Sequence, residues 1–182
     1  LAQHEAELVT SAVFFAHVLG VSSQALQSRI ATLPPLAGRL ELHVLNQITV
    51  LDDAYNASPA AMMAAFQTLQ GLPEIGRRVA VLGEMHELGA QSRALHEQVG
   101  VNLSDSGIPV LFALGKAGQW IADAFEKRGG MVFCADSIPS LQELLQEHLR
   151  PNDVILLKAS RAERLEQLLP HFHSLPFQRC VS

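Results

Sequence analysis

The chain has few cysteines, few aromatic residues and no long apolar run. Its 182 residues include two cysteines, one tryptophan and one tyrosine. Cys134, in an apolar run, and Cys180, near the end, form neither a disulfide framework nor a metal-ligand cluster, which favours a reducing compartment. No apolar stretch approaches the roughly 20 residues that a membrane-spanning helix needs. The first apolar segment is interrupted by His17 and followed by Gly20, which is not typical of a signal peptide. These absences predict a cytoplasmic protein.

Charged residues are also scarce, at 17% of the chain, and the formal net charge is -5. A negative balance argues against a protein that binds nucleic acid by neutralising phosphates. Hydrophobic residues make up 48%, which predicts a well-covered interior rather than disorder. The length suits one full domain, or a domain with a piece of another. Because the first residue is Leu1 rather than methionine, we expect a part of a longer protein.

The first 35 residues predict two helices that cannot enclose a core alone. The first, residues 4–19, stops at Gly20, and the second, capped by Ser22 or Ser23, reaches about residue 33 before Pro34-Pro35. We expect them to pack against a missing segment or on the next part of the chain. The character of the chain changes at about residue 36, which is the best domain boundary.

From there, strand-like and helix-like segments alternate. Continuous apolar strands separated by helices predict an α/β fold with a doubly wound, mostly parallel Rossmann-like sheet and helices on both faces. The expected strands are residues 40–45 and 48–51, joined as a hairpin by Asn46-Gln47, then 78–82, 110–114, 131–135 and 154–157. The expected helices are residues 59–70, 91–104, 117–128, 138–149 and 162–169.

In such a sheet the carboxyl ends of the strands collect at one edge, where ligands bind. Residues 52–59, Asp-Asp-Ala-Tyr-Asn-Ala-Ser-Pro, run from a strand through an acidic turn to a helix with Ser58 as cap and Pro59 as first residue. This junction can hold a sugar diol or a cation. Residues 158–161, Lys-Ala-Ser-Arg, suit a carboxylate or phosphate at a helix N-terminus. Their spacing fits a cap with solvated charges equally well.

The remaining polar groups have plainer interpretations. Glu84 and Glu87 could anchor an amine or a cation, but we favour a stabilising role in a first helical turn. The turn at residues 115–118 lacks the serine or threonine of a phosphate loop. The eight histidines have no metal-binding spacing, so we expect a packing role for His96 and a surface loop around His171 and His173. The methionines Met62-Met63 should fill the core beside the sheet.

Five blocks together occur in the order and spacing of one family. They are Gly-Arg-Leu-Glu at 38–41, the block at 52–59, Leu-Gly-Glu-Met-His-Glu-Leu-Gly at 82–89, His-Glu-Gln-Val-Gly at 96–100 and the block at 158–161. On these residues the chain resembles the Mur ligases, and the block at 52–59 resembles the branch that adds D-alanyl-D-alanine. The resemblance implies that residues 1–35 are the last helices of a central ATPase domain and that residues 36–182 are the C-terminal Mur ligase domain.

The resemblance also implies a reaction and its ligands. ATP with Mg²⁺ would phosphorylate the carboxylate of UDP-N-acetylmuramoyl-tripeptide, and the amine of D-Ala-D-Ala would then displace phosphate, in peptidoglycan precursor synthesis. By position, Asp53 should hold the ATP ribose, Arg39 should reach the ribose or phosphates, and Tyr55 and Asn56 should line the nucleotide side. No metal ligand is expected here, because those of Mg²⁺ should lie mainly on the missing central domain, and the protein should be a monomer.

Three further residues resemble those that meet the incoming amino substrate or the phosphate, and these are the expected catalytic residues: Lys158, Ser160 and Arg161. The sequence departs from the family pattern at Ala159, where glycine is usual, and at Glu5 and Leu8, where asparagines are usual.

The phosphate-binding Gly-Lys-Thr/Ser loop is absent, so the isolated chain should be inactive. A non-catalytic binding module and a folylpolyglutamate-synthase-like ligase are the alternatives, the second opposed by Tyr55-Asn56.

Overall fold

The computed structural model describes residues 3–32, 36–73 and 76–177. The chain divides into two compact units, Leu1–Leu36 and Ala37–Ser182, which are described separately. The predicted positions Pro34, Pro35 and Cys180 lie outside the described residues, as do the side chains of Glu5 and Leu8. None of the described helices is both long enough and apolar enough to cross a membrane.

The first unit consists of the two predicted helices, α1 (Gln3–Val18) and α2 (Ser23–Ala31). Gly20, at φ 88°, ends α1, and its amide donates to the carbonyl of His17, which is a common way for a helix to stop at glycine. Ser22 caps α2 by accepting a hydrogen bond from the amide of Ala25. No described residue of α2 is buried, so the pair encloses no core of its own, as the sequence predicts.

The second unit is a six-stranded sheet in the order β1-β2-β6-β3-β4-β5, with β1 antiparallel to β2 and the other pairs parallel. This confirms the predicted fold class. The strands are β1 (Glu41–Leu45), β2 (Ile48–Asp52), β3 (Arg78–Leu82), β4 (Val110–Leu114), β5 (Met131–Ala135) and β6 (Val154–Lys158). The longer helices are α3 (Pro59–Gly71), α4 (Ser92–Asp105), α5 (Gly115–Glu126) and α6 (Ile138–His148).

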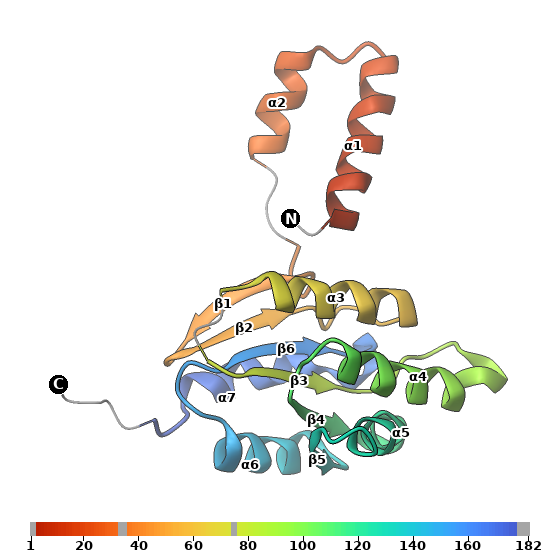
Figure 1. Cartoon of the computed structure of the whole chain (residues 1–182). Coiled ribbons are helices and arrows are strands. Elements are labelled where there is room, and N and C mark those ends of the chain that lie inside the picture. Colours follow the sequence, from red (N-terminus) through yellow and green to blue (C-terminus); the bar gives the residue numbers. More distant parts are fainter. Residues whose placement is uncertain (1–2, 33–35, 74–75, 178–182) are drawn as a thin grey trace. The chain divides into compact units, whose positions relative to one another are not determined.

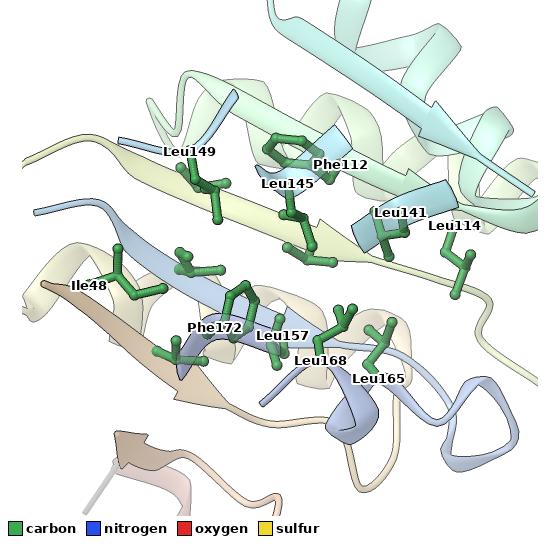
Figure 2. Packing of buried hydrophobic residues seen from close by; sticks show 14 of the residues in the cluster. Ile48, Phe112, Leu114, Leu141, Leu145, Leu149, Leu157, Leu165, Leu168 and Phe172 are labelled. Atoms are coloured by element: carbon green, nitrogen blue, oxygen red, sulfur yellow. The ribbon is translucent and has the colours of Figure 1, made fainter. Parts of the chain in front are cut away.

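Helices cover both faces of this sheet (Figure 1). Helices α3, α4 and α5 pack on one face, where the buried side chains include Met62, Phe66, Leu103, Ile121 and Phe125. Helix α6 and the C-terminal segments cover the other face (Figure 2), where the labelled core residues are Ile48, Phe112, Leu114, Leu141, Leu145, Leu149, Leu157, Leu165, Leu168 and Phe172. Every residue of β4 and β6 is buried, because these strands have a covered face on either side.

Local sequence explains the boundaries of the hairpin and of α3. Asn46 and Gln47 both have positive φ, 41° and 69°, as a two-residue turn of type I′ requires. Ser58 accepts a hydrogen bond from the amide of Ala61 and Pro59 opens the helix, so the predicted junction is confirmed. Gly115, at φ 73°, makes the tight turn that leads from β4 into α5.

The predicted helix at residues 162–169 is wrong. Arg164 has φ 53°, and this left-handed residue separates two short 3₁₀ helices, η2 (Arg161–Glu163) and η3 (Leu165–Leu168). They lead into α7 (Leu169–His173), so His171 and His173 are helical rather than in a loop. Leu165 and Leu168 still reach the core, since the three-residue period of a 3₁₀ helix places them on one side.

Helices α4 and α5 approach so closely at Gly100 that a Cβ there would lie 2.2 Å from the carbonyl oxygen of Ile121 and 2.9 Å from the Cβ of Ala124. Gly100→Ala should therefore lower the free energy of unfolding by about 1–3 kcal/mol through overpacking. Gly71→Ala is the matched control, because a Cβ at this helical glycine meets nothing within 4 Å. Urea denaturation of both variants measures the difference, and equal stabilities would contradict the proposed close packing.

Candidate functional site

The turns that follow β2, β3 and β6 form one continuous edge of the sheet, because β6 lies between β2 and β3. Backbone hydrogen bonds join them. The amide of Asp53 donates to the carbonyl of Leu157 at 2.9 Å, and the amide of Ser160 donates to the carbonyl of Glu84 at 2.8 Å. The predicted gathering of polar turns is thus present for these three strands.

Lys158 is the last residue of β6 and is only 1% exposed. Its Nζ donates to the Asp53 carboxylate at 2.5 Å, to the carbonyl of Asn56 at 2.9 Å and to the carbonyl of Asp53 at 3.4 Å. These acceptors use the whole donor capacity of an ammonium group. Burial lowers the pKa of Lys158 from its ordinary value, and the neighbouring Asp53 carboxylate opposes that shift. The interpretation of Lys158 as a solvated charge is wrong.

The Asp53 carboxylate also ties the edge to the segment before β1. Its Oδ1 accepts a hydrogen bond from the amide of Leu40 at 3.3 Å, while the amide of Tyr55 donates to the carbonyl of Gly38 at 3.0 Å. The Asp53 side chain remains 15% exposed. It therefore pairs with Lys158 at a position that solvent partly reaches.

Asp52 is the buried neighbour of this group and has a separate role. Its carboxylate accepts a hydrogen bond from the amide of Ala54 at 3.0 Å, which shapes the exit from β2. Burial raises the pKa of Asp52 above the usual carboxyl value, and the hydrogen bond from Ala54 opposes that shift.

The guanidinium groups of two arginines lie over the exposed ring of Tyr55. The Cζ atom of Arg39 lies 4.3 Å from the ring centroid and that of Arg161 lies 5.0 Å from it. Such distances are favourable for cation–π contacts. Arg39 and Tyr55, predicted for the nucleotide side, thus lie next to Arg161, predicted for the other substrate.

A pocket of about 440 Å³ opens between the same three turns. Of the predicted site residues, Asn56, Ser160 and Arg161 line it, whereas Arg39, Asp53, Tyr55 and Lys158 do not. The whole lining is Asn56, Ala57, Ser58, His86, Glu87, Ser160, Arg161 and Ala162. The sequence analysis did not include His86 in the site, and it favoured only a helix-dipole role for Glu87.

Ser160 joins the turns that line this pocket. It is 4% exposed, and its Oγ accepts a hydrogen bond from the amide of His86 at 2.8 Å. The expected helix N-terminus is also missing, because only the three-residue η2 follows. Ala159 is buried and is not among the residues with positive φ, so alanine in place of the usual glycine imposes no backbone strain.

The favoured helix-dipole role of Glu84 and Glu87 is wrong as well. Both residues lie in the turn before η1 (Gly89–Gln91) and α4. Glu87 has φ 63°, a conformation that non-glycine residues seldom adopt.

His96 holds this turn in place, as a buried packing histidine. Its Nε2 accepts a hydrogen bond from the amide of Met85 at 2.9 Å, so its Nδ1 is the nitrogen that donates to the carbonyl of Ser92 at 2.7 Å. The packing role predicted for His96 is confirmed.

Two side-chain groups in the described part of the chain have the proximity that a metal ion needs, with ligand atoms within 4.8 Å of one another. They are Glu41, His43 and Asp52, and Glu84, His86 and Glu163. Sequence spacing could not reveal the second, because Glu163 comes from a segment far along the chain from Glu84 and His86. Each mixes imidazole with carboxylates, a set that suits zinc better than magnesium.

Comparison with known proteins adds three findings. The family model of the Mur ligase, glutamate ligase domain matches residues 38–161. UDP-N-acetylmuramoyl-tripeptide–D-alanyl-D-alanine ligase of Bacillus subtilis is 31% identical over 174 residues, which cover 93% of this chain and 38% of that protein. The chain thus spans well under half of this relative.

Solved structures agree with this family likeness. A crystal structure of MurF from Acinetobacter baumannii superposes with a TM-score of 0.81 at 27% identity, covering 94% of this chain and 38% of the other. MurF ligase from Thermotoga maritima, solved in complex with ADP, gives a TM-score of 0.70 at 28% identity, covering 88% and 36%.

The Lys158–Asp53 pair should be strongly coupled, because removing one partner leaves the other without compensation in a largely buried place. In a double-mutant cycle of Lys158→Met and Asp53→Asn, we expect a coupling energy of about 2 kcal/mol or more, measured by urea denaturation. The exposed pair Arg93–Glu97, at 2.8 Å, is the matched control and should give below about 0.5 kcal/mol. A coupling energy of the Lys158–Asp53 pair no larger than that of the control pair would show that the two side chains do not stabilise each other as proposed.

Proposed function

Because the chain belongs to the Mur ligase family, with residues 38–161 matching the glutamate ligase domain, we propose that it acts as the C-terminal part of an ATP-dependent ligase that joins D-Ala-D-Ala to UDP-N-acetylmuramoyl-tripeptide. The observation that carries this proposal is the single sheet edge that gathers Arg39, Asp53 and Tyr55 beside a polar pocket. On this proposal residues 1–35 end a central ATPase domain and residues 36–182 form the C-terminal domain. The protein would act as a monomer in the cytoplasm.

The proposed reaction has two steps. ATP transfers its terminal phosphoryl group to the tripeptide carboxylate, which gives an acyl phosphate and ADP. The amine of the dipeptide then attacks the carbonyl carbon, loses a proton and expels phosphate. A protein accelerates such a reaction mainly by positioning the two reactants and stabilising the charge that develops on oxygen.

The nucleotide half of the proposed site is built from Asp53, Arg39 and Tyr55, with Asn56 beside them. A partly exposed carboxylate suits the paired hydroxyls of a ribose, and the guanidinium of Arg39 suits the ribose or phosphates. These donor and acceptor types fit the nucleoside side of ATP. On this proposal the phosphate loop, which these residues lack, would lie on a different segment. The isolated chain should therefore not turn over ATP, and closure of two domains would assemble the site.

The amino-substrate half is the pocket itself, with Ser160 and Arg161 as the proposed contacts of the incoming dipeptide or the phosphate. The resemblance implied that Lys158 contacts a substrate, but its surroundings favour a positioning role. Its ammonium is enclosed by Asp53 and Asn56, so we assign it to positioning the turn that carries both halves rather than to contact with substrate.

The proposal predicts that Asp53→Ala, made in the complete ligase, raises the KM for ATP by roughly tenfold or more, as expected for loss of a hydrogen bond to a charged group. Asp53 also pairs with Lys158, so the KM for D-Ala-D-Ala should rise as well, but by a smaller factor. Asp105→Ala is the control, because Asp105 is an exposed aspartate at the end of α4. Steady-state kinetics measures both constants, and an unchanged KM for ATP would remove Asp53 from the nucleotide site. A complete protein without ligase activity would instead favour the non-catalytic binding module.

A further inference from the structure

Two side chains of opposite charge, Glu87 and Arg161, line the same pocket from separate turns. Glu87 is in the turn after β3 and Arg161 is in the turn after β6, and both are exposed. Neither forms an ion pair or a side-chain hydrogen bond with another described residue. Opposite charges that share a pocket without closing on each other leave a place for a ligand that carries both.

Hydrogen bonds hold together the two turns that carry these charges. Ser160, next to Arg161, donates its amide hydrogen to the carbonyl of Glu84 and accepts the amide of His86. From the other side, His96 accepts the amide of Met85. The two turns are thus held together by groups that are not available to a ligand, while the charged side chains are left outside this network.

Arg161 is additionally oriented by the ring of Tyr55, 5.0 Å from its Cζ. A guanidinium that stacks on an aromatic ring retains its N–H donors at the edge for a carboxylate.

The rest of the lining consists of His86, whose Nε2 lies 3.3 Å from the Glu163 carboxylate, and of neutral residues. Asn56, Ser58 and Ser160 offer neutral polar groups, and Ala57 and Ala162 offer methyl-sized walls. These neutral walls suit a ligand whose own side chains are uncharged. A further charge on the ligand would be repelled by either Glu87 or Arg161.

We infer that Glu87 binds the ammonium group of the incoming dipeptide and that Arg161 binds its carboxylate, so the two residues together select a small zwitterion with neutral side chains. This inference rests on the proposed ligase function, which supplies the dipeptide. Before reaction the dipeptide amine is protonated in solution, and a carboxylate in contact with it sets its position. Glu87 is therefore a specificity-determining residue for the incoming dipeptide.

The test combines variants with two substrates in the complete ligase. D-Ala-D-Ala carries both charges, and D-alanyl-D-alaninamide carries only the ammonium. Glu87→Gln should raise the KM for both by about tenfold or more, because each loses its ammonium partner. Arg161→Gln should raise the KM for D-Ala-D-Ala in the same range and leave that for the amide nearly unchanged. The KM for ATP should stay constant in Glu87→Gln.

Glu126→Gln and Arg150→Gln are the matched controls, since Glu126 ends α5 and Arg150 precedes β6, and both are exposed. They should leave the constants for both dipeptides unchanged. Glu87→Gln preserves size at an exposed position, and circular dichroism checks that each variant is folded.

Two results separate failure of this inference from failure of the proposed function. An active ligase in which Glu87→Gln leaves the KM for D-Ala-D-Ala unchanged overturns the inference alone. If the wild-type protein does not ligate, the proposed function fails. An NMR titration of the present chain with D-Ala-D-Ala then tests whether the pocket binds this dipeptide. Shifts of the Glu87 and Arg161 amides that are lost in Glu87→Gln would support a zwitterion site, and absence of shifts would overturn it.

Discussion

The buried ammonium of Lys158 is the interaction on which the edge of this sheet depends. A lysine at the end of a central strand loses hydration on every side, and it is tolerated only because acceptors surround it. Asp53 provides the charge and Asn56 provides a carbonyl. Because β2 and β6 are neighbours in the sheet, this side chain and the backbone bond from Asp53 to Leu157 together fix the turn after β2 against the end of β6.

That constraint extends outward through the same turn. Asp53 also accepts the amide of Leu40, and Tyr55, two residues further on, stacks with Arg39 and Arg161. The residues proposed for the nucleotide and those that line the pocket therefore share one support. A ligand that contacts the Asp53 carboxylate would change its hydrogen bond with Lys158, so binding on one side of the turn would alter the geometry of the other. On the proposed function, this gives a physical reason for two substrates of one reaction to bind at adjacent strand ends.

Much of the fold could be predicted from the sequence, because local signals agreed with one another. The Asn46-Gln47 turn, the Ser58 cap with Pro59 and the apolar strands each indicated the same alternation, which the structure confirms. The segment after Ser160 was mispredicted, since Leu165 and Leu168 fit the period of either helix type and nothing local marks Arg164 as left-handed. For the candidate site, the sequence predicted which residues lie at the strand ends, but not the contacts between them. The pairing of Lys158 with Asp53 joins residues 105 apart and depends on the order of strands, and the part of Glu87 in the pocket depends on how two turns are joined.

The most direct test of this account is a crystal structure of the complete ligase with ADP and D-Ala-D-Ala. The account predicts that the Asp53 carboxylate accepts hydrogen bonds from the ribose hydroxyls while Lys158 remains bonded to the turn of residues 53–56. It also predicts the dipeptide between Glu87 and Arg161. A ribose bound away from Asp53, with the Lys158 ammonium turned out toward the phosphates, would contradict the central claim that Lys158 supports the site from within.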